Sequence, residues 1–295
     1  GLGTGEPEKV IITHVDADGN KTVIAESGHG GGSPTGNGDR FGAAVSICSG
    51  SEGVFMAVGA PTVSDVYYYF YSDALGMEDL TDNTSISPTP SMRYGSKIKC
   101  IYDEAESKVF YAISDAPSSY SVSHDITVYL NSVPLTGPSA FDVAAETTFT
   151  FTDGNKNSTN PATTHPRDWL GLDMIRLSST GDILTLISSQ NYQDTDLGAV
   201  RIFWWDDSAG TSVSAGPLAD VSNPTAGGFG SDVSIVETYS TGSGPGPDSK
   251  SYGYVAVGRS LPFSRTAPPP SPEWSSTPSV VLYETEFTSN TFFDL

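Results

Sequence analysis

Short apolar runs of four to eight residues, separated by turn-forming segments, make up most of the chain. The runs are rich in Val, Ile, Tyr and Phe, and no stretch has the 3.6-residue apolar period of a long amphipathic helix. In residues 66–73 (VYYYFYSD), alternation places Tyr67, Tyr69 and Tyr71 on one face of a strand and further aromatic side chains on the other. We therefore predict an all-β protein whose strands are buried on both faces.

One unit of this pattern recurs along the chain. It opens with an aromatic or aliphatic residue followed by Gly, at Phe41-Gly42, Tyr94-Gly95, Leu170-Gly171 and Phe229-Gly230. A strand, a polar hairpin, a second strand and an aromatic-rich third strand follow each opening, and at least two copies add a weaker fourth element. The predicted repeats span residues 38–92, 93–160, 167–225 and 226–295, and residues 9–37 form a partial copy around the turn DADGN.

A small antiparallel sheet of this kind needs cover on both faces. Sheets arranged around a common axis provide that cover for one another and leave only short edges. The repeats therefore predict a single β-propeller domain over residues 1–295, with four-stranded antiparallel blades and about five blades in this chain.

The order of motifs resembles the FG-GAP repeat of integrin α-subunit propellers. The first copy carries the resemblance best, with Phe41-Gly42, Gly59-Ala60-Pro61 and Val66-Tyr67, and the second keeps Tyr94-Gly95 and Asp115-Ala116-Pro117. The resemblance spans roughly residues 38–290 and implies an alternative blade count, in which the chain forms part of a seven-bladed ring. It also implies a role in extracellular recognition or adhesion, and related repeats occur in some fungal lectins.

The formal net charge of −21 limits the classes of partner. Only 14 Lys and Arg residues are present and they form no basic stripe, which argues against nucleic acid as a ligand. No apolar run approaches the roughly 18 residues that span a bilayer, so direct membrane insertion is not expected. The acidity favours solubility in a saline medium or association that depends on cations.

Three sequence triplets match the N-glycosylation acceptor, at Asn20, Asn83 and Asn157. All three lie where turns are expected. They predict a secreted or cell-surface-associated glycoprotein whose partners are other extracellular proteins, copies of itself or glycans.

Asp16, Asp18 and Asn20 form the one D-x-D-x-N run, a weak candidate for Ca²⁺ because it lacks a distal acidic ligand. An Asp-Gly pair between two strands is also typical of a plain hairpin turn. The resemblance implies calcium in the hairpins between the first two strands of each repeat. Those hairpins (CSGSEGV, DEAESKV and SSTGDIL) lack the required alternate acids.

Catalytic signals are sparse in the sequence. There is no G-x-S-x-G motif, and the four His residues have no metal-ligand spacing. Carboxylate pairs suited to glycoside hydrolysis exist in any chain with 35 acidic residues, but no spacing singles one out. Trp274, in the Pro-rich loop 265–279, is the candidate for stacking on a ligand such as a sugar ring, and covering a hydrophobic patch is an equally compatible role.

Cys48 and Cys100 are the only cysteines. They lie on the predicted inner strands of adjacent repeats, where a disulfide and two free thiols are both compatible with the sequence. An alignment of the two openings places Ile47, rather than Cys48, opposite Cys100.

Taken together, these features predict a non-enzymatic extracellular module for recognition, adhesion or structure. The alternatives are a carbohydrate-binding lectin and, less favoured, a glycan-active hydrolase.

Overall fold

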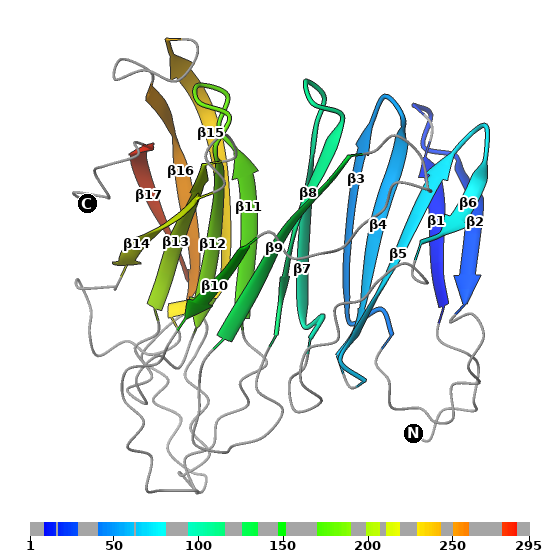
Figure 1. Cartoon of the computed structure of the whole chain (residues 1–295), viewed down its shortest axis with the longest axis horizontal. Coiled ribbons are helices and arrows are strands. Elements are labelled where there is room, and N and C mark those ends of the chain that lie inside the picture. Colours follow the sequence, from blue (N-terminus) through cyan, green and yellow to red (C-terminus); the bar gives the residue numbers. More distant parts are fainter. Residues whose placement is uncertain are drawn as a thin grey trace, which may run out of the picture. The chain divides into compact units, whose positions relative to one another are not determined.

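The chain is built from β-strands joined by turns, as the computed structural model in Figure 1 shows. The structure describes residues 9–15, 17–28, 41–61, 63–80, 94–115, 126–134, 147–151, 170–189, 199–206, 211–218, 229–242, 250–259 and 279–287. Every regular element in these ranges is a strand, which confirms the all-β class. Among these residues there is no helix of the length and hydropathy needed to cross a membrane.

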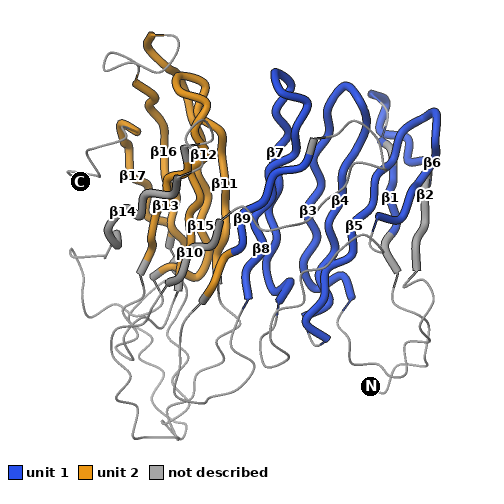
Figure 2. The backbone as a smooth tube through the Cα atoms, viewed as in Figure 1, with its two compact units in different colours: residues 1–118, 129–146 blue, residues 119–128, 147–295 orange. Residues whose placement is uncertain are grey.

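The chain divides into two compact units, coloured separately in Figure 2. Unit 1 comprises residues 1–118 and 129–146, and unit 2 comprises residues 119–128 and 147–295. Unit 1 begins with a two-stranded sheet, β1 (Lys9–Val15) and β2 (Lys21–Gly28). Its next sheet contains β3 (Ala44–Gly50), β4 (Gly53–Ala60), β5 (Asp65–Ser72) and β6 (Gly76–Asp79), in that order.

A second four-stranded sheet has the order β10-β9-β8-β7, of which β7 and β8 belong to unit 1 and β10 to unit 2. Its strands are β7 (Lys97–Asp103), β8 (Lys108–Ser114), β9 (Ile126–Pro134) and β10 (Thr147–Phe151). Strands β7 and β8 pair antiparallel along their whole length, as do β3 and β4 in the preceding sheet. Sequence neighbours are thus sheet neighbours, which is the strand order that the repeat predicts.

Unit 2 contains two sheets with the same antiparallel order. The first consists of β11 (Leu170–Arg176), β12 (Ile183–Ser189), β13 (Ala199–Asp206) and β14 (Thr211–Leu218). The second consists of β15 (Phe229–Thr241), β16 (Lys250–Arg259) and β17 (Ser279–Phe287). The aromatic-rich third strand that the repeat predicts is β17 in this sheet.

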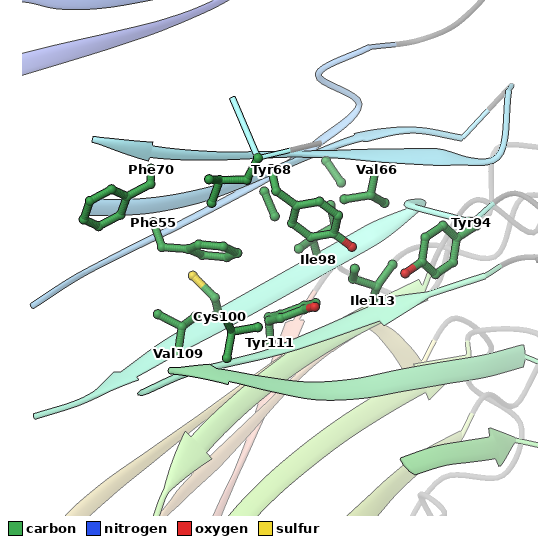
Figure 3. Packing of buried hydrophobic residues seen from close by; sticks show 14 residues of the cluster. Phe55, Val66, Tyr68, Phe70, Tyr94, Ile98, Cys100, Val109, Tyr111 and Ile113 are labelled. Carbon is green, nitrogen blue, oxygen red and sulfur yellow. The ribbon is translucent and has the colours of Figure 1, made fainter. Parts of the chain in front are cut away.

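An apolar layer packs against each face of the sheet that runs from β3 to β6. Figure 3 shows the larger layer, in which side chains of this sheet meet those of β7 and β8. The rings of Phe55 and Tyr68 pack on Tyr111, with centroid distances of 5.7 and 5.6 Å. The other layer contains Tyr67 and Tyr69 and extends to β1. Strand β5 is therefore buried on both faces, which confirms the prediction from its aromatic run.

One apolar layer joins the two sheets of unit 2. Trp204 lies in it together with branched residues of β12, β15 and β16. Trp205 points to the opposite face of β13 and is also buried. Both tryptophans therefore serve packing.

Glycine opens three of the four inner strands, which are β3, β7, β11 and β15, with the same backbone conformation. Gly42, Gly95 and Gly230 have φ values of 85°, 84° and 83°, a left-handed conformation without steric cost for glycine. A Cβ atom on Gly59 would overlap the carbonyl oxygen of Gly95. Glycine at this site therefore lets the end of β4 approach the opening of the next sheet.

The sequence pattern misplaces the opening of the third repeat by two residues. The N–H of Lys97 donates to Ser114 Oγ at 3.1 Å, and the N–H of Gly171 donates to Ser188 Oγ at 3.0 Å. Gly171 thus takes the place of Lys97 and has no left-handed φ. The prediction that Leu170 and this glycine form an opening pair is wrong. Glycine is present because a side chain here would collide with the backbone of β15.

In each unit, a side-chain oxygen on one inner strand accepts a hydrogen bond from the inner strand of the adjacent sheet. The two side chains that do so occupy equivalent positions. In unit 1, the Oγ atom of Ser46 accepts the backbone N–H of Cys100 at 2.8 Å. In unit 2, Oδ2 of Asp173 accepts the backbone N–H of Ile235 at 2.9 Å. Ser46 and Asp173 occupy equivalent positions. Each lies two residues after the inner-strand residue that pairs with the next-to-last residue of the second strand of its sheet.

Candidate functional site

The outward face of the last sheet in unit 2 leaves large apolar side chains exposed to solvent. Its opposite face supplies Val233, Ile235, Val255 and Val257 to the core layer. Alternation along the strands turns the remaining side chains away from that layer. We call this surface the open face, and its members are Val236 and Tyr239 on β15, Lys250, Tyr252, Tyr254 and Ala256 on β16, and Val280, Leu282, Glu284 and Glu286 on β17.

The strand register relates the open face to a buried face in unit 1. In the sheet that runs from β3 to β6, two residues of the third strand, β5, pair with Ala57 and Gly59 of the second strand, β4. In the last sheet, two residues of the third strand, β17, pair with Ala256 and Gly258 of the second strand, β16. Val280 and Leu282 are therefore the counterparts of Val66 and Tyr68.

These counterparts differ sharply in solvent exposure. The adjoining sheet covers Val66 and Tyr68, which are 1% and 2% exposed. Val280 and Leu282 are 69% and 62% exposed. A face that has the residue pattern of a sheet–sheet interface is thus left in solvent.

The rim of the open face is aromatic and charged. The rings of Tyr239 and Tyr252 stack with centroids 4.6 Å apart and an interplanar angle of 14°. Lys250 Nζ lies 2.7 Å from Glu286 Oε1, and this hydrogen bond raises the pKa of the lysine. Partial desolvation, followed by the charge of Glu286, raises the pKa of Tyr252. The rim can thus form stacking and charge-assisted contacts around an apolar centre.

Strand β17 forms the edge of this sheet in the described part of the chain. It pairs with β16 along Ser279–Phe287, and the sheet has three described strands where its neighbour in unit 2 has four. An edge strand presents unpaired backbone groups that can accept a further strand. The open face therefore adjoins an edge strand to which a further strand can bind.

The first sheet of unit 1 also leaves apolar side chains in solvent. Ile12 of β1 belongs to a core layer, whereas Ile11 and Val15 on the same strand, and Val23 on β2, are exposed. Uncovered apolar residues thus occur on both the first and the last sheet. Contiguous surfaces of this type are typical of interaction sites.

The structure places only some of the predicted site residues. Asn20 and Asp18 are exposed in the hairpin between β1 and β2, where Gly19 has a φ of 82°. The segment is thus a hairpin turn, with the acceptor asparagine accessible. Among the described residues, no group of three acidic, His or Cys side chains is arranged to hold a metal ion. The other predicted site residues, Asp16, Asn83, Asn157, Trp274 and the loop 265–279, lie outside the described residues.

The two cysteines are free thiols in the structure, so the alternative without a disulfide describes this state. Cys48 nevertheless packs against the apolar layer that contains Cys100. Ile47 is 55% exposed and does not face Cys100, contrary to the alignment of the openings. The alignment gives the correct height of this part of β3 relative to β7. The pleat, however, points Ser46 and Cys48 toward the neighbouring sheet and Ile47 away from it.

Comparisons with known proteins provide little further guidance. No protein-family model matches the chain, and no curated protein is significantly similar to it in sequence. A structural neighbour is the GH43 protein BlXynB from Bacillus licheniformis, at 11% sequence identity and a TM-score of 0.27. The similarity covers 85% of this chain and 54% of the neighbour, so the chain spans about half of that protein's length.

Proposed function

We propose that the chain is a β-propeller-type module, with about five blades, that serves recognition, adhesion or structure outside the cell without catalysing a reaction. Its open face associates with a second copy of the chain. Within each unit, sheets pack face to face with their inner strands adjacent, which is the packing of successive propeller blades. The exposed Asn20 acceptor fits an extracellular location.

The observation that carries the proposal is the exposure of Val280 and Leu282. Their counterparts Val66 and Tyr68 are buried by another sheet, so the open face has the residue types that such a partner covers. The uncovered residues on β1 and β2 supply a second apolar surface on the same chain. Two different apolar surfaces on one chain favour head-to-tail association.

The net charge determines how this association responds to salt. Chains with a charge of −21 repel one another, and the repulsion falls as the Debye length shortens. Burial of apolar surface is not weakened by salt in the same way. Association through the open face is therefore expected to strengthen with ionic strength.

Sedimentation velocity over a concentration series tests the proposal. The wild-type chain should form larger species as concentration and salt rise. The double variant Val280→Lys/Leu282→Lys should stay monomeric, because two charges on the face prevent its burial. Leu75→Lys is the matched control, since Leu75 is also exposed but lies in the turn between β5 and β6, and it should behave as the wild type. A folded wild-type chain that stays monomeric throughout would contradict the proposal.

Carbohydrate binding is the second candidate function, favoured by the stacked pair Tyr239 and Tyr252. Flat aromatic rings at an exposed rim are suited to stacking on sugar rings. A glycan array distinguishes the two functions. Sugar-specific binding that is lost in Tyr239→Ala and kept in Leu75→Lys would support the lectin. Binding to no glycan, together with self-association, would support the structural module.

A further inference from the structure

Cys48 and Cys100 come together between two sheets of unit 1, although 51 residues separate them in the sequence. Cys48 lies on β3 and Cys100 on β7. The hydroxyl of Ser46 holds Cys100 in place, because it accepts the Cys100 N–H at 2.8 Å and donates to the Cys100 sulfur at 3.4 Å. In Figure 3 the sulfur of Cys100 points into the layer between the two sheets.

Cys48 packs against the apolar layer that contains Cys100. A side-chain hydrogen bond with Cys100, followed by burial, raises the pKa of the Cys48 thiol well above its ordinary range. Cys48 is half-buried and Cys100 is buried, so a reagent in solution can reach the first thiol more readily. Unequal access is a feature of an attacking and a resolving cysteine.

The equivalent positions in unit 2 hold no cysteine. Ile175 and Ile235 stand there and pack in the apolar layer between the sheets of that unit. The fold therefore brings two inner-strand side chains together at this level, and an aliphatic pair satisfies the packing. Nothing in the strand pairing of unit 1 requires two thiols at the same level.

We propose that Cys48 and Cys100 form a cross-sheet disulfide under oxidising conditions, and that the structure shows its reduced form. The bond would join β3 to β7 and covalently link the two sheets on either side of the aromatic layer. The proposal does not rest on the function proposed above.

The oxidant is a low-molecular-weight disulfide such as oxidised glutathione. The Cys48 thiolate attacks one sulfur of the oxidant, whose S–S bond breaks, and the first glutathione leaves as a thiolate that takes up a proton. The Cys100 thiolate then attacks the Cys48 sulfur of the mixed disulfide and displaces the second glutathione. The two protein thiols lose two electrons and two protons in total, and one oxidised glutathione becomes two reduced glutathiones.

The proposal predicts a pH-dependent rate and a stability gain. Because the reactive species is the thiolate and the pKa of Cys48 is raised, oxidation should be slow at neutral pH and faster in alkali. Closure of the long loop between the cysteines restricts the unfolded chain. The melting temperature should therefore rise by on the order of 10 °C on oxidation.

The experiment uses the full chain, reduced and then equilibrated with oxidised glutathione. Titration of thiols under denaturing conditions should fall to zero, and the intact mass should fall by two hydrogen atoms. Peptide mapping without reductant should recover the peptides around Cys48 and Cys100 as one linked species. The melting temperature should return to its starting value after dithiothreitol is added.

Two variants control for geometry. Cys48→Ser should keep one free thiol and show no redox-dependent melting temperature. The double variant Ile47→Cys/Cys48→Ser keeps two cysteines but moves one to the solvent side of β3, so it should acquire glutathione without an internal bond. The proposal would be overturned if the wild-type chain retained both thiols or formed only mixed disulfides. Equal cross-linking in the double variant would overturn it as well.

Discussion

The carboxylate of Asp173 on β11 reaches across to β15, where its Oδ2 atom accepts the backbone N–H of Ile235 at 2.9 Å. The same oxygen accepts the hydroxyl of Ser234 at 3.0 Å, and Oδ1 accepts the N–H of Met174 at 2.9 Å. Asp173 is buried, so these bonds are made away from bulk water. One carboxylate thus connects the two sheets of unit 2 at the position that Ser46 occupies in unit 1.

Removal of this carboxylate should destabilise unit 2. Asp173→Ala leaves the N–H of Ile235 buried without an acceptor, and the free energy of unfolding should fall by about 3 kcal/mol. Asp173→Asn keeps one acceptor oxygen and should cost less. Urea denaturation measures both, with the exposed Glu284→Ala as control. Equal stability of the Ala and control variants would show that the contact between the sheets does not stabilise the fold.

A methyl group at Gly59 should be more damaging than one at Gly76. A Cβ at Gly59 would overlap the Gly95 backbone, which has no side chain that can move aside. At Gly76 the space is open and the cost is that of a left-handed alanine, about 1 kcal/mol. Gly59→Ala should therefore lower the free energy of unfolding by more than Gly76→Ala in thermal denaturation. A smaller or equal loss would contradict the close approach of the two sheets.

Alkaline pH should destabilise unit 1 through its buried tyrosines. Burial raises the pKa of Tyr68 and of Tyr94 above the ordinary value of 10.0. In the unfolded chain both lose their protons above about pH 10, whereas the folded chain retains them. The resulting stability is complete below pH 10 and is lost as the pH rises from there toward the raised values.

The slope of the free energy of unfolding against pH identifies the tyrosines that titrate. Each buried tyrosine should contribute up to about 1.4 kcal/mol per pH unit above pH 10. Tyr94→Phe should reduce the slope, and Tyr239→Phe in unit 2 should leave the slope for unit 1 unchanged. Urea titrations at several alkaline pH values provide the measurement, and an unchanged slope in Tyr94→Phe would refute this assignment.

Asn131 offers a route to a more stable protein. Its side chain is fully buried, and neither amide atom has a hydrogen-bond partner among the described residues. On β9 it lies between Tyr129 and Val133, which pack in the apolar layer of unit 1. Asn131→Leu should raise the free energy of unfolding by about 1 kcal/mol, because an unsatisfied amide is removed. Asn131→Asp should lower it, and a loss of stability in the Leu variant would show that the amide has a partner.

The sequence predicts much of the fold because strands and their faces depend on local pattern. The aromatic run around Tyr68 indicates a strand buried on both faces, and the structure confirms it. The turn at Gly19 and the hairpins between paired strands also follow from local residue types. Leu170 and Gly171 are misassigned because register depends on the partner strand, which the pattern of one strand does not specify.

The candidate site is harder to predict, because exposure depends on what lies beyond a face. Leu282 and Tyr68 are both apolar and occupy equivalent positions, yet only the second is covered by another sheet. The same limit applies to Cys48, whose packing against the layer that contains Cys100 follows from the pleat of β3. The hydrophobic pattern states which side chains favour burial and does not reveal whether a neighbour is present.

Hydroxyl-radical footprinting of Val280 and Leu282 tests the central claim most directly, because it reports the solvent accessibility of individual side chains. In dilute solution both residues should oxidise readily, whereas their counterparts Val66 and Tyr68 should be protected. As concentration and salt rise, Val280 and Leu282 should become protected and the exposed control Leu75 should not. Protection already complete in the dilute monomer, or reactivity that never changes with concentration, would contradict an open face that associates with a second copy.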